Sequence, residues 1–181
     1  MPALDLDGLR PSVAWTGDRI QIIDQTKLPG EFTLLELASV DDVVDAIYRL
    51  AVRGAPAIGA CGALGMVVGL DERRPRDSSS ARTALAELAA VIGSARPTAV
   101  NLQWAVDRVR DVAALGESPS EVRAQALTEA LKIIAEDREA GTLIGEAGRA
   151  ELAGLSSIMS HCNTGRLATA GGGPALGVSE A

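Results

Sequence analysis

The sequence has few aromatic residues, one histidine, two cysteines and no excess of positive charge. Aromatic side chains make up 2% of the 181 residues, so a core must be built from Ala, Leu, Val and Ile, which favours closely packed helices. His161, Cys61 and Cys162 supply too few nitrogen and sulfur ligands for a zinc site, and the two cysteines lack CxxC spacing. We therefore expect a reduced, cytoplasmic protein without a metal ion.

Charge and hydropathy exclude further classes of protein. Seventeen Lys and Arg residues against 24 Asp and Glu residues give a net charge of −7, which argues against binding to nucleic acid or to an anionic membrane. A hydrophobic share of 47% excludes a wholly disordered chain. Residues 1–10 contain acids and no long apolar run, so they do not predict a secretory signal. The uncharged stretch 54–70 is shorter than the ~20 residues of a membrane span and predicts a buried helix.

Strand signals come first along the chain and helix signals follow. Residues 12–15 and 19–24 flank a Thr-Gly-Asp turn and predict a β-hairpin, to which residues 32–37 could add a third strand. Apolar residues at helical spacing then predict helices at about 39–53, 56–70, 83–92, 99–114 and from 118 onward, with a loop at 71–82. Residues 155–160 favour a short strand, and the glycine run 171–173 after it indicates that a new unit begins there.

An arginine and a glycine stand directly before one predicted helix. The order Arg53-Gly54-Ala55-Pro56 would place unpaired backbone N–H groups and the positive end of a helix dipole beside a cation, which suits an anion such as phosphate. The alternative is purely structural: Gly54 ends the preceding helix and Pro56 starts the next. Spacing alone does not decide between the two.

Two further positions carry the same kind of ambiguity. Arg96 stands before Pro97 and another helix start, where its guanidinium could hold a phosphate or be an ordinary surface arginine. Cys162 follows the predicted strand 155–160, at the edge where open α/β sheets bind ligands, and could be reactive or simply buried. His161 is interpreted as an ordinary histidine. A dinucleotide site is excluded, because the glycines of stretch 54–70 do not form GxGxxG after a strand.

Six stretches spread over nearly the whole chain match one known family in order. They are DQTKLP (24–29), VRGAPAIG (52–59), RPTAVNLQWA (96–105), ED (136–137), IG (144–145) and SHCNTGRLATAGGGPALGV (160–178). Together they resemble the S-methyl-5-thioribose-1-phosphate isomerase family, which also includes ribose-1,5-bisphosphate isomerases and the regulatory subunits of translation initiation factor 2B.

The resemblance implies both a fold and an activity. The fold would be α+β: a small N-terminal antiparallel sheet and a helical domain over residues 1–152, then the first strand of a truncated Rossmann-like domain over residues 153–181. The activity would be conversion of 5-methylthioribose 1-phosphate to 5-methylthioribulose 1-phosphate in methionine salvage, by a homodimer and without a cofactor. Cys162 would be the catalytic cysteine, and the substrate contacts would be Arg53, Gly54, Ala55 and Arg96.

The same resemblance limits what this chain is expected to do alone. The family's catalytic aspartate lies in the part of the second domain beyond Ala181, so we expect a fragment that is inactive by itself. The alternative is a non-catalytic module that binds sugar phosphates or regulates a partner, like the initiation-factor subunits. The HCNTG motif around Cys162 favours the isomerase.

Overall fold

The structure is a computed structural model that describes residues 11–152, 155, 157, 159 and 165–171. Its N-terminal part is the predicted antiparallel sheet, with strand order β1-β2-β3. Strand β1 (Val13–Trp15) pairs with β2 (Ile20–Ile23), and β2 pairs with β3 (Leu34–Leu37). The alternating apolar side chains that predicted the hairpin bury one face of this sheet against the helices.

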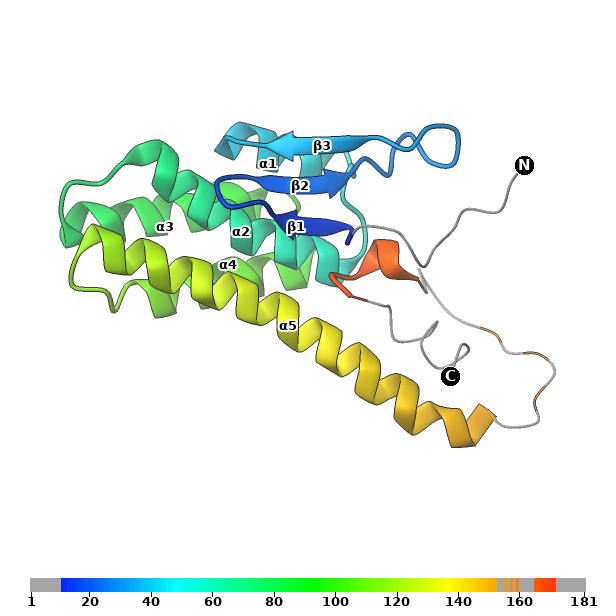
Figure 1. Cartoon of the computed structure of the whole chain (residues 1–181). Coiled ribbons are helices and arrows are strands. Elements are labelled where there is room, and N and C mark those ends of the chain that lie inside the picture. The colour runs from blue at the N-terminus through cyan, green and yellow to red at the C-terminus, as the bar shows by residue number, and fades with distance from the viewer. Residues whose placement is uncertain (1–10, 153–154, 156, 158, 160–164, 172–181) are drawn as a thin grey trace.

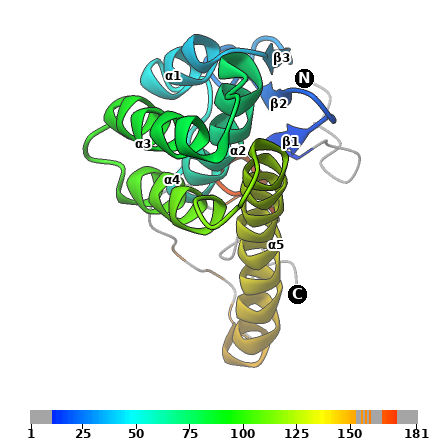
Figure 2. The same cartoon turned by 90° about the vertical axis from the view of Figure 1, so that its left-hand side faces the viewer.

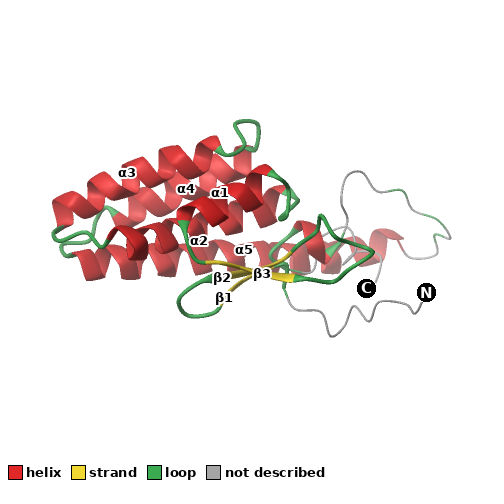
Figure 3. Cartoon of the chain, turned by 90° about the horizontal axis from the view of Figure 1, so that it is seen from above, coloured by secondary structure: helices red, strands yellow, loops and turns green. Residues whose placement is uncertain are grey.

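The five helices form one body beside the sheet, as Figures 1 and 3 show. They are α1 (Val40–Tyr48), α2 (Ala55–Arg73), α3 (Ser78–Ser94), α4 (Val100–Ala113) and α5 (Pro119–Leu152), followed by a short 3-10 helix η1 (Arg166–Ala168). The sheet lies along one side of the helices and α3 lies on the opposite side (Figure 3). The predicted α+β architecture is confirmed for the sheet and the helical part.

Helix α2 is the centre of the core, because it contacts all four other helices, strands β1 and β2, and η1. Every residue from Ala57 to Leu70 is buried. This helix is long and apolar enough to cross a membrane, but 78% of its apolar window is buried inside the fold, as expected of a core helix. Its glycines allow close approach: a Cβ on Gly62 would lie 2.3 Å from Leu102, and one on Gly69 would lie 2.3 Å from Leu88.

Two predicted boundaries were wrong. Helix α1 starts at the predicted capping box of Ser39 and Asp42 but ends at Tyr48, not near residue 53. It ends early because Leu50 takes a left-handed φ of 61° and the Ala51 N–H bonds back to the Ala46 carbonyl at 2.9 Å. The predicted loop 71–82 is shorter, because α2 continues to Arg73 and Asp77 caps the start of α3 at Ser78.

Helix α5 is much longer than the elements around it and projects beyond them (Figures 1 and 2). Its last buried large side chains are Ile133 and Ile134. At 1.5 Å per residue, the helix continues for roughly 27 Å after Ile134. Within that extension Leu143 and Ile144 are 56% and 48% exposed.

The C-terminal predictions are tested only in part. Of the predicted strand 155–160, residues 155, 157 and 159 belong to no regular element, and the others lie outside the described residues. The boundary between residues 152 and 153 stays a prediction. Residues 165–171, which we call the return segment, pack back onto the N-terminal part of the fold, where the Gln25 side chain donates to the Leu167 carbonyl at 2.7 Å.

Candidate functional site

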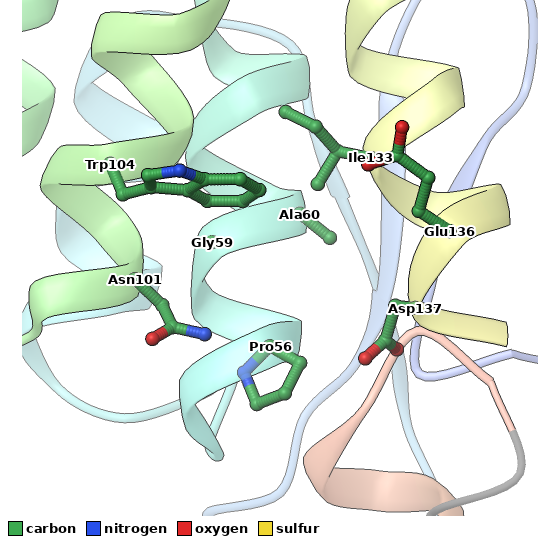
Figure 4. Close-up of a pocket in the computed structure, with 8 residues that line it drawn as sticks. All are labelled: Pro56, Gly59, Ala60, Asn101, Trp104, Ile133, Glu136 and Asp137. Carbon is green, nitrogen blue, oxygen red and sulfur yellow. The ribbon is translucent and has the colours of Figure 1, made fainter. Parts of the chain in front are cut away.

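Helices α2 and α4 begin at the same end of the molecule. Gly59 lies against the Asn101 backbone and Gly62 lies against Leu102 and Val106, so the two helices run side by side in the same direction. Figure 4 shows the first turns of both helices together, at Pro56 and Asn101. Their N-cap residues make no side-chain capping hydrogen bond. Two positive helix ends, neither of them capped by its own N-cap side chain, therefore face one region.

The two predicted arginines flank these helix starts. Arg53 is exposed and directly precedes Gly54, the N-cap of α2. Arg96 is half-buried, and its carbonyl accepts from the N–H of Ala99, the N-cap of α4. Both guanidinium groups thus belong to the turns that lead into the paired helix ends. This arrangement suits an anion with several oxygen acceptors, such as a phosphate.

The structural alternative for Gly54 was that it ends the preceding helix. The structure gives this glycine another position. It is the N-cap of α2, with φ 95° and ψ 135°, a backbone conformation that favours glycine. A Cβ at Gly54 would lie 2.2 Å from the carbonyl oxygen of Ala168 in the return segment. Ala55, the first residue of α2, is exposed. Gly54 is therefore required both by the backbone and by contact with the return segment.

A pocket of about 250 Å³ opens beside the paired helix starts. It lies between three helices, with walls from α2, α4 and α5 (Figure 4). The residues that line it are Pro56, Gly59, Ala60, Asn101, Trp104, Ile133, Glu136 and Asp137. The pocket combines an apolar floor, an aromatic face, one amide and two carboxylates.

Arg108 links α4 to α5 at one wall of the pocket. Its guanidinium donates two hydrogen bonds to Glu136, at 2.6 and 2.9 Å, and contacts the buried Glu129 carboxylate at 2.6 Å. It also lies over the Trp104 ring, 5.3 Å from the ring centroid. Hydrogen bonds from Arg108 lower the pKa of Glu136, so this carboxylate stays charged. Trp104 and Glu136 are thereby held by one cation.

Asp137 connects the pocket to the return segment. Its carboxylate accepts the Ala170 N–H at 2.8 Å, while Arg138 donates through Nε to the Ala170 carbonyl at 2.9 Å. Burial raises the pKa of Asp137, and the Ala170 N–H and Arg138 offset part of that rise. Sequence reasoning did not select Asp137 or Arg138 as functional residues. The available signal was the Glu-Asp pair within the family resemblance.

The structure describes some of the predicted site residues and not others. Arg53, Gly54, Ala55 and Arg96 belong to the two neighbouring helix starts, whereas Cys162 and His161 lie outside the described residues. Within the described part of the chain, no three His, Cys, Asp or Glu side chains are grouped so that they could hold a metal ion. The structure therefore gives the positions of the four predicted binding residues, and their role stays a prediction, as does that of Cys162.

The second cysteine, Cys61, is fully buried in α2, and burial raises the pKa of its thiol to about 12. Since the thiolate is the form that reacts, we expect Cys61 to resist alkylation by iodoacetamide at pH 8 in the folded chain and to react once urea unfolds it. Peptide mass spectrometry before and after unfolding measures this directly. Rapid modification of Cys61 in the folded chain would contradict the burial described here.

Comparison with known proteins gives one consistent family. The model of the Initiation factor 2 subunit family matches residues 51–180. A methylthioribose-1-phosphate isomerase of Desulforudis audaxviator is 47% identical over 92% of this chain and 48% of its own length. A 5-deoxyribose 1-phosphate isomerase of Moorella thermoacetica is 41% identical over 91% of this chain and 47% of its own.

Two solved structures share the fold. The 5-methylthioribose 1-phosphate isomerase of Pyrococcus horikoshii superposes with a TM-score of 0.84 at 29% identity, covering 96% of this chain and 50% of that one. A structure titled translation initiation factor eIF-2B, subunit delta, from A. fulgidus also gives 0.84, at 42% identity, over 95% of this chain and 50% of its own. The chain thus spans about half the length of the relatives that it matches.

Proposed function

The chain belongs to the initiation factor 2 subunit family, and on that premise we propose that it forms the substrate-binding half of a methylthioribose-1-phosphate isomerase. The observation that carries the proposal is the pair of neighbouring helix starts flanked by Arg53 and Arg96. Two guanidinium groups and converging backbone N–H groups match the charge and the acceptor oxygens of a sugar 1-phosphate.

The proposed reaction explains why a rigid phosphate site is useful. In an aldose 1-phosphate the anomeric oxygen carries the phosphate, so the ring must open with acid assistance before hydrogen moves from C2 to C1. Arg53, Arg96 and the N–H groups of α2 and α4 would fix the phosphate and hold C1 and C2 in one place. Cys162 would act at the reacting carbons, and its acid/base partner would come from the half of the relatives that this chain does not match.

The wider setting is also part of the proposal. The names of the curated relatives support a small sugar phosphate as the substrate and a place in methionine salvage. We further propose that the protein works in the cytoplasm as a homodimer, without nucleic acid or membrane partners. Its net charge of −7 agrees with the last point.

A second candidate function is supported by one observation. The A. fulgidus structure with the same fold is titled as an initiation-factor subunit, which suggests that this fold can also serve as a non-catalytic binding or regulatory module. Both candidates predict phosphate binding at the helix starts, whereas only the isomerase predicts turnover that depends on Cys162.

Removing either arginine is expected to weaken binding of 5-methylthioribose 1-phosphate. Because a hydrogen bond to a charged group contributes about 1.5–3 kcal/mol, Arg53→Ala or Arg96→Ala should raise the Kd roughly ten-fold or more in calorimetric titrations. Arg76→Ala is the matched control, since Arg76 is exposed and lies between α2 and α3, beyond the opposite end of α2. An unchanged Kd in both Arg53→Ala and Arg96→Ala would contradict the proposed phosphate site.

A further inference from the structure

The loop after strand β2 contains the motif DQTKLP, residues 24–29, which has no role in the phosphate site described above. Two of its polar side chains, Asp24 and Gln25, are nevertheless buried. Burying a polar side chain costs free energy unless hydrogen bonds satisfy it. The partners of these two side chains therefore indicate what the loop holds in place.

Asp24 fixes the loop itself. Its carboxylate accepts from the Thr26 backbone N–H at 3.0 Å and from the Thr26 hydroxyl at 2.6 Å, and Arg49 donates to it at 3.4 Å. Burial alone would raise the pKa of Asp24, but the bonds from Thr26 and Arg49 lower it overall, so the carboxylate stays charged. The backbone N–H of Asp24 donates to the Thr33 carbonyl at 2.9 Å. Gln25 therefore extends from a backbone that is held on both sides of the loop.

Gln25 joins two segments that are far apart in the sequence. Its backbone N–H donates to the Ala51 carbonyl at 2.9 Å, and its side-chain amide donates to the Leu167 carbonyl at 2.7 Å. Ala51 begins the turn that leads into α2, residues 51–54, which we call the phosphate turn. Leu167 belongs to the return segment. One residue thus bonds to both.

The phosphate turn and the return segment also touch each other directly. A Cβ at Gly54 would lie 2.2 Å from the Ala168 carbonyl oxygen and 2.4 Å from its Cα, so only a glycine fits between them. Figure 1 shows η1, which is part of the return segment, beside the start of α2. Arg53 is therefore restrained on both sides, at Ala51 by a hydrogen bond and at Gly54 by packing.

The return segment is a firm support for the phosphate turn, because it is anchored to other elements as well. The Ser12 hydroxyl, at the start of the sheet, donates to the Thr169 carbonyl, and both residues are buried. On the other side, Asp137 and Arg138 of α5 bond to the N–H and the carbonyl of Ala170. Gln25 connects this anchored segment to the turn that carries Arg53.

We propose that Gln25 is a positioning residue of the phosphate site. It aligns the return segment with the phosphate turn and so fixes Arg53 and the first N–H groups of α2 before a phosphate arrives. Gln25 acts through the backbone and not through contact with the ligand. A site held in place in advance binds more tightly, because less ordering remains to be done on binding. The inference rests on the proposed function, which assigns the turn to phosphate binding.

The test measures the Kd of 5-methylthioribose 1-phosphate for this chain by calorimetry. Gln25→Met keeps the length of the side chain and removes the N–H donor. Because one hydrogen bond corresponds to roughly a two-fold to ten-fold change in an equilibrium constant, the Kd should rise roughly five-fold. Amide hydrogen exchange in the return segment should become faster in the same variant. Circular dichroism checks that the fold is retained.

Ser12→Ala is the second variant, in case Gln25→Met does not fold. It releases the return segment at Thr169 and leaves the loop of Gln25 unchanged. Because the segment then supports the phosphate turn less firmly, the Kd should rise with this variant too.

Combined variants separate positioning from a general loss of stability. Gln25 restrains the turn that carries Arg53, whereas Arg96 belongs to the turn before α4. Gln25→Met should therefore raise the Kd less in an Arg53→Ala background than in an Arg96→Ala background, because residues that act together are not additive. A merely structural role would give the same increase in both backgrounds.

Arg82→Met is the matched control, since it also removes side-chain bonds to backbone carbonyls. Arg82 is exposed and donates to the carbonyls of Ala114 and Gly116, beyond the opposite end of α4. The Kd should stay unchanged. The inference is overturned if Gln25→Met and Ser12→Ala both bind as wild type does, or if Gln25→Met adds the same loss in the two arginine backgrounds.

The same titrations separate this inference from the proposed function. Binding that depends on Arg53 and Arg96 but not on Gln25 would overturn the inference and leave the phosphate site standing. A wild-type chain that does not bind the sugar phosphate would overturn the proposed function, and the role of Gln25 with it.

Discussion

Replacing Gly54 by alanine is expected to destabilise the fold by about 3 kcal/mol. The backbone at φ 95° costs a non-glycine residue about 1–3 kcal/mol, and the added Cβ would meet the Ala168 carbonyl at 2.2 Å. The return segment would have to move away from α2, which also strains the hydrogen bonds of Ala170 with Asp137 and Arg138. Urea unfolding followed by circular dichroism measures the loss.

Gly17→Ala is the control that separates backbone strain from the steric clash. Gly17 also has a positive φ, 112°, but a Cβ there would meet nothing within 4 Å. The Gly17→Ala variant should lose about 1 kcal/mol of its free energy of unfolding, which is the cost of the backbone conformation alone. Equal losses for the two variants would show that the return segment does not press on Gly54 as described.

Replacing Cys162 by alanine should remove most of the turnover. The assay needs a complete enzyme, so residues 1–181 are fused to the half of the Desulforudis audaxviator relative that this chain does not match. If Cys162 acts at the reacting carbons, its loss should lower kcat by roughly 10³-fold, within the range of general acid–base catalysis. Production of 5-methylthioribulose 1-phosphate is the readout.

Cys61→Ala is the matched control, because it removes the other thiol and lies buried within α2. It should keep kcat within a few-fold of the fusion protein, since the raised pKa of Cys61 keeps its thiol protonated. A Cys162→Ala fusion that retains most of its turnover would remove the isomerase assignment of this residue. A fusion that binds the sugar phosphate without any turnover would favour the regulatory candidate.

Local signals predicted most of the elements. The capping box of Ser39 and Asp42, the proline in the first turn of α2 and the alternation of Ile20 and Ile22 act within a few residues, so they can be recognised in the sequence. The end of α1 could not be predicted in this way. Leu50 takes a left-handed conformation without being glycine, and the Ala51 carbonyl accepts from Gln25, far away in the sequence.

The same distinction between local signals and distant contacts applies to the candidate site. Arg53 and Arg96 stand beside helix starts, which sequence spacing reveals, but their common position depends on how α2 packs against α4 through Gly59 and Gly62. The pocket depends on a third helix, and Arg108 reaches Glu129 and Glu136 over 21 and 28 positions of sequence. Contacts of that kind leave no periodic signal. The family motifs pointed to Trp104 and Asp137 without giving them a role.

The long extension of α5 has a consequence for local stability. Up to Ile134 the helix is held by buried side chains, and at Asp137 and Arg138 by the return segment. After Arg138 the helix continues for another 14 residues, a length near the lower limit at which a helix persists in water without tertiary contacts. We therefore expect the free energy of opening to fall along a single helix, from a value near that of global unfolding at its core end to a much smaller one toward Leu152. One continuous helix thus spans two regimes of amide protection.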